Sequence, residues 1–503
     1  MRATLAAVML IGCAPLLPPG PVPVDEAARP ARLLFVPDPA SPNIYLQAIV
    51  AAGSSWDRPG TEGLAHLTAR AMVEGGAGEL TGPELRDALY PTGNQLELVV
   101  DKEWVSLRLR CHVDHAELCI DHFADVLTEP RFAANDVIRL REDAVYAVTD
   151  ALLASEEALG DAVFDAVLYE GHPYAHPVEG RAGALPTLDA DDARAFHASH
   201  YVRESVVVGL AGAADDALRD RLATRLEALP GVPRPDRVAM APAPVAAGSL
   251  TIVQTPGDVT GFHIGHPIST DRNHDDWPAL YVAMTAFGAH RQSFGRLFQA
   301  IRGDRGLNYG DYAYVEHYVQ QGWSPPPENG VLRSHNHFVM WLRPTSLPNG
   351  PFAAKMARAE LERLLEEGLP DEELQEVVSH LDGAIPLLAT DPGRRLAYAL
   401  DAEISGTPNL LEHIPRHLPQ LTPDGIRAAL ARHIHPDELV VVAVSGDADD
   451  LRERLLGDEP TPVVYADVEP SEAQAARDNE VQAMGMGLDE QRVVILEADG
   501  VFR

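Results

Sequence analysis

The chain has 503 residues, 46% of them hydrophobic, and a mean hydropathy of −0.11. This length exceeds what one hydrophobic core usually supports, so we expect at least two folded domains and exclude a wholly disordered chain. The formal charge is −35, from 75 acidic and 40 basic side chains. A surface this negative repels phosphate backbones, which excludes nucleic acid as a partner.

The start of the chain is typical of a targeting segment. An apolar run from Ala3 to Ile11 leads to Cys13 in a Leu-Ile-Gly-Cys sequence that resembles the bacterial lipobox. We predict a lipoprotein signal peptide over residues 1–12, a lipid on Cys13 and a Pro-rich tether over residues 13–32. Acyl chains would hold the protein on a membrane, so we expect it in the bacterial cell envelope, on the outer membrane facing the periplasm. An ordinary secretory signal or a misassigned start codon is the alternative.

Strand-like and helical patterns alternate through the first half of the chain. Strand-like runs occur at Asn43 to Ala51 and Leu96 to Cys111, and helical patterns at Pro83 to Tyr90 and Ala116 to Leu127. Both element types together predict helices layered against a sheet.

Cys111 and Cys119 are eight residues apart, at the junction of a predicted strand and a predicted helix. Two interpretations remain open. The cysteines could form a disulfide in an oxidising compartment, or they could be two buried thiols.

The chain contains an internal duplication. A Leu-Pro-x-Leu sequence, a helical stretch and an apolar run ending in Gly and acidic residues occur in this order at 185–216 and again at 418–450. The glycines that end the apolar runs, Gly212 and Gly446, are 234 residues apart. The repeat predicts two similar domains, because each copy has the same succession of elements.

The domain boundary follows a change in composition. Prolines cannot continue a helix, and a Pro/Ala-rich linker covers residues 230–248. We therefore predict an N-terminal domain at 33–229, a C-terminal domain at 249–460 and a tail at 461–503. The predicted fold class is α+β, with two tandem, homologous α/β layered domains.

Several motifs resemble those of the insulinase/pitrilysin metallopeptidases. They follow in the family's order at Gly53 to His66, Gly171 to Tyr174, Gly180, Ser293 to Leu297 and Ile301 to Tyr309. The resemblance extends from about residue 33 to residue 456. It implies the insulinase-like fold and a peptide substrate.

The resemblance also shows what the zinc motif lacks. In that family, two histidines one helical turn apart bind zinc, and a Glu between them takes a proton from the zinc-bound water. The corresponding sequence here is His66-Leu67-Thr68-Ala69-Arg70. Ala69 replaces the Glu, Arg70 replaces the second His, and the family's third ligand falls at Ala147 or Val148. Since Arg70 also places a permanent positive charge where a dication would bind, we expect no metal and no catalytic residue in this chain.

Arg302 and Tyr309 fit a second feature of the family. They are seven residues apart in the predicted C-terminal domain, and the resemblance implies that such a pair contacts the substrate backbone. A guanidinium and a phenol suit a peptide carbonyl or the oxyanion that develops on it. Arg305 fits the spacing less well.

Three functions follow from these motifs. We favour a non-catalytic subunit that binds peptide through Arg302 and Tyr309, beside a zinc-bearing sister chain that holds the cofactor. One alternative is an active metalloendopeptidase with an atypical metal site, in which Glu62 or Glu74 joins His66. The other is a non-proteolytic binding or assembly protein.

Overall fold

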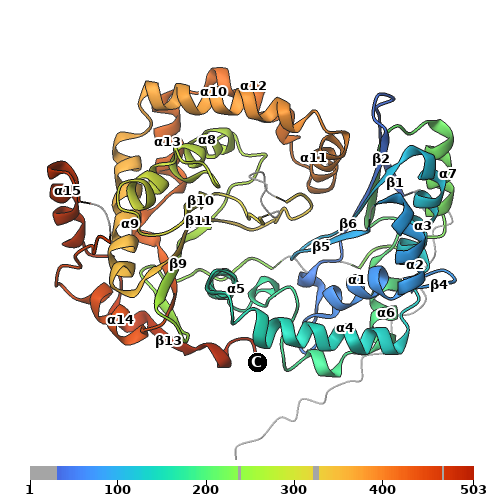
Figure 1. The fold of residues 1–503 in the computed structure, drawn as a ribbon, viewed down its shortest axis with the longest axis horizontal. Helices are drawn as coiled ribbons and strands as arrows, with labels where there is room; N and C mark the ends of the chain where they lie inside the picture. Colours follow the sequence, from blue (N-terminus) through green and yellow to red (C-terminus); the bar gives the residue numbers. More distant parts are fainter. Residues whose placement is uncertain (1–30, 94, 236–239, 321–327, 467–468) are drawn as a thin grey trace, which may run out of the picture.

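Two layered domains lie side by side in a computed structural model of the chain (Figure 1). The structure describes residues 31–93, 95–235, 240–320, 328–466 and 469–503. Cys13 and the predicted signal peptide lie outside these residues. Each domain has one main mixed sheet with helices against it, which confirms the predicted α+β class of tandem layered domains.

The first sheet has five strands, in the order β1-β7-β2-β6-β5. β1 is parallel to β7, and the other neighbours are antiparallel. The strands are β1 (Arg32–Pro37), β7 (Val206–Gly212), β2 (Asn43–Val50), β6 (Val105–His112) and β5 (Glu97–Val100), and a small hairpin adds β3 (Gly76–Ala77) and β4 (Leu80–Thr81). The strand-like run from Leu96 to Cys111 is therefore two strands, because a turn at residues 101–104 divides it.

The second sheet repeats this order and adds one strand. Its order is β10-β11-β9-β12-β8-β13, and β12 is parallel to β8 as β7 is to β1. The strands are β10 (Asp311–Tyr314), β11 (Asn336–Ser346), β9 (Val259–Ile268), β12 (Val440–Ser445), β8 (Leu250–Gln254) and β13 (Val493–Glu497). Without β13, the two sheets have the same topology, as the sequence duplication predicts.

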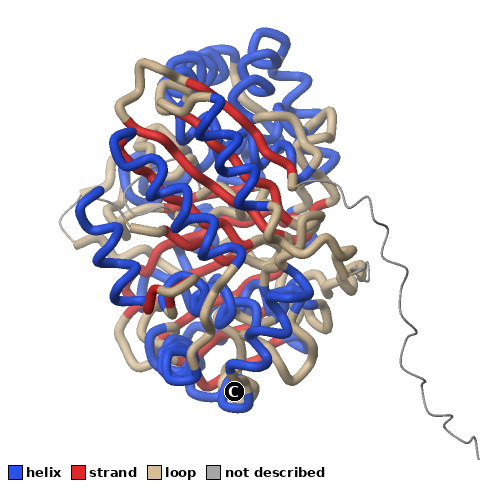
Figure 2. Tube along the Cα trace, turned by 90° about the vertical axis from the view of Figure 1, so that its right-hand side faces the viewer, coloured by secondary structure: helices blue, strands red, loops and turns tan. Residues whose placement is uncertain are grey.

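Each sheet is covered on one face by helices of its own domain. Those of the first domain are α1 (Leu64–Glu74), α2 (Gly82–Leu89), α3 (Ala116–Thr128), α4 (Ala134–Tyr146), α6 (Ala190–His200) and α7 (Asp216–Leu226). Those of the second are α8 (Trp277–Gly288), α9 (Gly350–Glu367), α10 (Asp371–Leu388), α12 (Leu410–His417), α13 (Pro423–His433), α14 (Ala448–Leu456) and α15 (Glu472–Gln482). Figure 2 shows the strands lying between these helices.

The other face of each sheet is covered by a helix from the opposite domain. α5 (Glu156–Leu168) packs on β9 and β12 of the second sheet, and α11 (Pro392–Ser405) packs on β2 and β7 of the first (Figure 1). Side chains of α5 share a core with the strand residues Val442 and Val444. This exchange of helices fastens the two domains together.

The exchanged helices explain why two strands are apolar throughout. Every residue of β7 and of β12 is buried, since each strand has helices on both faces. Gly209 in β7 permits the close approach of α11, because a Cβ at this position would lie 2.4 Å from a methyl carbon of Leu396. The apolar runs of the duplication are thus strands buried on both faces.

The C-terminal segment is integrated into both domains. β13 extends the second sheet beside β8, and the backbone N–H of Ala182 in the first domain donates to the carbonyl of Phe502. The Phe502 side chain packs in the same core as α5. Residues 461–503, expected as a tail, therefore join the two domains. Among the described residues, no helix is both long and apolar enough to cross a bilayer.

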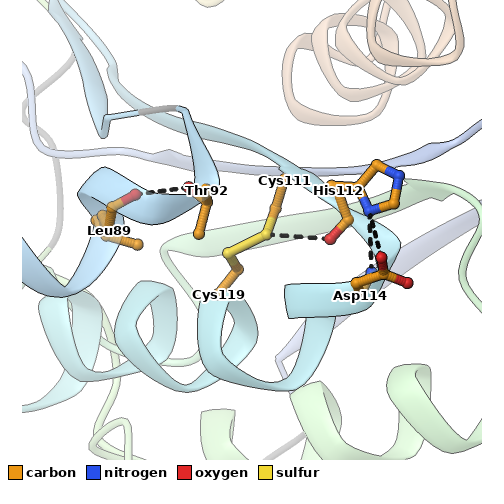
Figure 3. The surroundings of a disulfide bond; sticks show 6 residues. All are labelled: Leu89, Thr92, Cys111, His112, Asp114 and Cys119. Carbon is orange, nitrogen blue, oxygen red and sulfur yellow. Dashed lines mark hydrogen bonds and ion pairs between the residues drawn. A yellow bond between two sulfur atoms is a disulfide. The ribbon is translucent and has the colours of Figure 1, made fainter.

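Cys111 and Cys119 form a disulfide between the end of β6 and the first turns of α3 (Figure 3). Their Cα atoms are 6.5 Å apart, and both side chains are fully buried. The structure thus decides between the two interpretations of this pair in favour of the disulfide.

Replacing both cysteines by Ala is expected to lower the free energy of unfolding by about 2–3 kcal/mol, because a short closed loop restricts the unfolded chain. Equilibrium unfolding in urea measures the difference. The same comparison under a strong thiol reductant is the control, since wild type and variant should then nearly coincide. Equal stability of the oxidised proteins would contradict the prediction.

Candidate functional site

Two contacts, a side-chain cap and a close approach of backbone, position the start of the helix that carries the degenerate zinc motif. The carboxylate of Asp57 accepts hydrogen bonds from the backbone N–H groups of Gly63 (2.7 Å) and Ala65 (2.8 Å) and so caps the start of α1. Gly180 has a φ of +111°, and a Cβ there would lie 2.3 Å from the carbonyl oxygen of Glu62. Only glycine allows this approach, which brings the adjacent Glu179 to the same cavity as α1.

A cavity of about 1500 Å³ opens beside α1. His66, Arg70 and Glu74 line one side, strand β5 lines another, and Glu179 completes a third. β5 is the last strand of its sheet, so one of its edges has no neighbouring strand in the described structure. The motif helix and the outermost strand of the first sheet therefore line the same cavity.

His66 faces this cavity without a partner. Its Nδ1 atom is buried and has no hydrogen-bond partner among the described residues. Burial lowers the pKa of the His66 imidazole below its ordinary value, Glu179 opposes this effect, and the guanidinium of Arg70 adds to it. The ring is thus held neutral near pH 7, the form that binds metals.

Arg70 occupies the place of the second histidine as part of an ion network. Its guanidinium lies 2.7 Å from Glu74 and 3.5 Å from Asp143, and Arg139 pairs with the same two carboxylates. At an effective dielectric constant of about 20, a dication about 5 Å from a guanidinium is repelled by roughly 7 kcal/mol. The carboxylate of Glu74, the last residue of the motif helix, is paired with Arg70 and is not free to bind a metal.

The two residues expected at the position of the third zinc ligand lie in different surroundings. Ala147, the first residue of a π-helical turn after α4, lines the cavity, whereas Val148 lies in the hydrophobic core with 1% exposure. Of the two, only Ala147 therefore lines the same cavity as His66. Ala69 is also buried. Among the described residues, no group of three or more His, Cys, Asp or Glu side chains able to share one ion includes His66.

Arg302 and Tyr309 lie together on the surface of the second domain. The guanidinium carbon of Arg302 stacks 4.8 Å from the centre of the Tyr309 ring, and Tyr309 is 77% exposed. Tyr309 closely precedes β10, which is the edge strand equivalent to β5 in the first sheet. The pair does not line the cavity of His66.

Arg305, the less well spaced candidate, has a structural position. It is 4% exposed, and its guanidinium pairs with Asp478 of α15 at 2.7 Å. Arg305 therefore fastens the C-terminal segment and does not reach solvent. His337, one of several histidines with possible metal-binding chemistry, is likewise buried, and its Nδ1 lies 3.2 Å from the Tyr169 hydroxyl.

Sequence reasoning missed a buried ionic cluster where the domains meet. Arg333, in the segment before β11, donates to both oxygens of Asp101 (2.8 and 3.0 Å) and of Asp165 in α5 (2.9 and 3.1 Å). The same guanidinium donates to Nε2 of His317 at 2.9 Å, and burial lowers the pKa of His317 to about 3, which keeps this imidazole neutral. The only sequence signal was three consecutive charges, residues 101–103, inside an apolar run.

Comparisons with known proteins agree with these features. Residues 33–180 match the sequence model of the family described as Insulinase (Peptidase family M16), and residues 187–381 match that described as Peptidase M16 inactive domain. An uncharacterized zinc protease of Streptomyces coelicolor is 25% identical over 395 residues, which cover 75% of this chain and 79% of the relative. One of Mycobacterium tuberculosis is 27% identical over 361 residues, covering 70% and 76%.

Solved structures share the fold. The peptidase M16 inactive domain from Pseudomonas fluorescens superposes with a TM-score of 0.73 at 24% identity, over 83% of this chain and 96% of that one. A protease from Helicobacter pylori gives a TM-score of 0.68 at 14% identity, over 82% and 96%. The two matched sequence models cover the motif helix, the cavity and the Arg302/Tyr309 pair. The chain belongs to the insulinase (peptidase M16) family.

Proposed function

We propose that this chain is the non-catalytic, peptide-binding subunit of a two-chain zinc peptidase. One observation carries the proposal: the motif helix holds an ion-paired Arg70 where the second zinc ligand belongs, while Arg302 stacks on the exposed ring of Tyr309. The relatives are named zinc proteases. This chain matches them over 70–75% of its length and lacks two of the three expected metal ligands, so a sister chain would supply the zinc.

The cavity beside α1 supports peptide binding. An extended peptide can add to the open edge of β5 through backbone hydrogen bonds, which require no particular peptide sequence. Arg70 and Arg86, together with Glu74, Glu97 and Glu179, give the cavity walls both signs of charge. A binding site of this kind accepts peptide without cleaving it.

The direct test is purification of the chain from the envelope of its native host. We expect a second insulinase-family chain with an intact His-x-x-Glu-His motif to co-purify in a one-to-one ratio. The complex should cleave an unfolded peptide in a chelator-sensitive manner, and the isolated chain should not. Chelator-sensitive cleavage by the isolated chain, abolished by His66→Ala, would overturn the proposal.

Restoring the motif should restore a metal site. The triple variant Ala69→Glu, Arg70→His and Ala147→Glu is expected to gain about one equivalent of zinc over the wild-type chain, because it rebuilds two imidazoles and a carboxylate on one cavity wall. Metal analysis after gel filtration measures the gain. Adding His66→Ala to this variant should remove the gain of zinc. A second triple variant, with Val148→Glu in place of Ala147→Glu, should show no gain. No gain in the first triple would mean that the cavity wall cannot hold a metal.

We also propose a lipid anchor on Cys13, in agreement with the Pro-rich sequence behind it and with a disulfide that needs an oxidising compartment. Cys13→Ser, expressed in the native host, is expected to move most of the protein from the membrane fraction to the soluble fraction, since no acyl chain can then be attached. Cys111→Ser serves as the control for loss of a cysteine. An unchanged membrane fraction for Cys13→Ser would show that the protein is held there by other means.

A further inference from the structure

A second group of side chains with metal-binding chemistry lies in the C-terminal domain, on the side of its helices. His274 and Asp276 precede α8, and His433 is the last residue of α13. Nε2 of His433 lies 2.8 Å from Oδ2 of Asp276, and Nδ1 of His274 lies 3.8 Å from the same oxygen. One ligand atom from each residue lies within 4.8 Å of the others.

We propose that His274, Asp276 and His433 form a binding site for a divalent transition-metal ion, with zinc as the natural occupant. Two imidazole nitrogens and one carboxylate oxygen suit zinc and disfavour calcium and magnesium, which prefer oxygen ligands. Metal–ligand bonds of about 2.0–2.2 Å in a tetrahedron place ligand atoms about 3.4 Å apart. The separations of 2.8 and 3.8 Å lie on either side of that value.

The site is open enough for an ion to enter. The His274 side chain is 42% exposed, and those of Asp276 and His433 are 16% and 14% exposed. Solvent can therefore supply the fourth ligand as a water molecule. The ion would replace two hydrogen bonds, that of His433 to Asp276 and that of the Asp276 backbone N–H to Nδ1 of His274.

Arg432 keeps the carboxylate in place and limits the affinity. Its guanidinium donates to both oxygens of Asp276, at 2.6 and 2.8 Å, and these bonds lower the pKa of Asp276 to about 2. An ionised carboxylate has about four lone-pair sites, so two remain beside the guanidinium. The positive charge of Arg432 opposes a dication, as that of Arg70 does at the motif, but here three ligand atoms converge where the motif keeps one. We therefore expect binding weaker than that of a structural zinc site with four cysteine or histidine ligands.

Bound zinc would connect the start of α8 to the end of α13. Nearly all of α8 is buried in the core of the second domain, so this connection would stabilise that domain. An ion that binds only the folded protein raises the unfolding temperature as its concentration rises. The inference is independent of the proposed function, because none of the three residues belongs to the motif helix or to the Arg302/Tyr309 pair.

The test uses the full chain without an affinity tag, freed of metal by chelator and dialysis. Titration with Zn²⁺ is followed by calorimetry, and titration with Co²⁺ by visible absorption, since cobalt in a tetrahedral nitrogen and oxygen site absorbs visibly. We expect about one equivalent bound. Affinity should fall at least about 10-fold in His274→Ala and in His433→Gln. His274 is exposed, and the glutamine amide in His433→Gln can still donate to Asp276, so both variants should fold.

Two controls separate this site from others. His66→Ala tests the degenerate motif, and His417→Ala tests the histidine pair His413 and His417 one turn apart on α12. Both should bind zinc and cobalt as the wild type does. Wild-type affinity in His274→Ala and His433→Gln would overturn the proposal, as would failure of the wild-type chain to bind either ion. Loss of binding in His417→Ala alone would overturn it as well.

Discussion

Arg333→Met is expected to lower the free energy of unfolding by about 3–5 kcal/mol, because it leaves two buried carboxylates without their counter-charge. The Arg333 side chain is 2% exposed, and those of Asp101 and Asp165 are 4% and 6% exposed. Lys102, the other cation nearby, lies 3.6 Å from Asp165, too far for a normal hydrogen bond. It cannot replace four hydrogen bonds from a planar guanidinium.

The pKa values of these carboxylates set the conditions of the measurement. Burial alone would raise the pKa of Asp101 and of Asp165, but the charge of Arg333 holds both below the ordinary value. A carboxylate with a lowered pKa stabilises the fold above about pH 4, and this contribution is lost as the pH falls through the folded-state pKa. Unfolding in urea at pH 7, followed by tryptophan fluorescence, therefore measures the full effect.

A matched surface pair provides the control. Arg427 and Asp424 are paired but largely exposed, at 53% and 88%, so Arg427→Met should change stability by less than about 1 kcal/mol. Arg333→Lys keeps a charge, so its loss of unfolding free energy should lie between those of the two Met variants. It provides a measurable variant if Arg333→Met does not fold. Equal losses in Arg333→Met and Arg427→Met would show that the buried cluster stabilises the fold no more than an exposed ion pair does.

The largest effect on activity is expected from Arg302 and Tyr309, measured in the proposed complex with a zinc-bearing chain. If they donate to the oxyanion that forms on the substrate carbonyl, Tyr309→Phe should lower kcat about 10²–10³-fold. Only a hydroxyl is lost from a side chain that is 77% exposed, so the fold should not change. Arg302→Ala should have at least the same effect, because it removes a charge and also the cation stacked on the Tyr309 ring.

The controls for this pair need exposed residues outside the site. Arg305 is unsuitable because its loss would break the buried pair with Asp478. Tyr146→Phe and Arg427→Ala replace side chains that are also exposed, on α4 and α13, and should cleave at the wild-type rate. Gel filtration must show that every variant stays paired with its partner. Wild-type kcat in both Arg302→Ala and Tyr309→Phe would show the pair to be structural and would favour a binding or assembly protein.

Local patterns in the sequence were sufficient for the elements, the duplication and the family. The helices at residues 83–90 and 116–127 occur within one or two residues of their predicted positions, since amphipathic periodicity and capping residues act over a few residues. The loss of Glu and His from the motif is likewise visible in five consecutive residues, His66 to Arg70. These features depend on neighbours along the chain.

Only the tertiary structure decided which residues meet. Ala147 and Val148 are adjacent in sequence, and a π-helical turn directs one to the cavity and the other to the core. Arg302 and Arg305 are three residues apart, yet one is on the surface and the other is buried against α15. The exchange of α5 and α11 and the ionic cluster of Arg333 join segments far apart in the chain, such as Arg333 and Asp165, which are 168 residues apart. Such contacts depend on how whole layers pack, and amphipathic periodicity shows only that a face is buried, not what covers it.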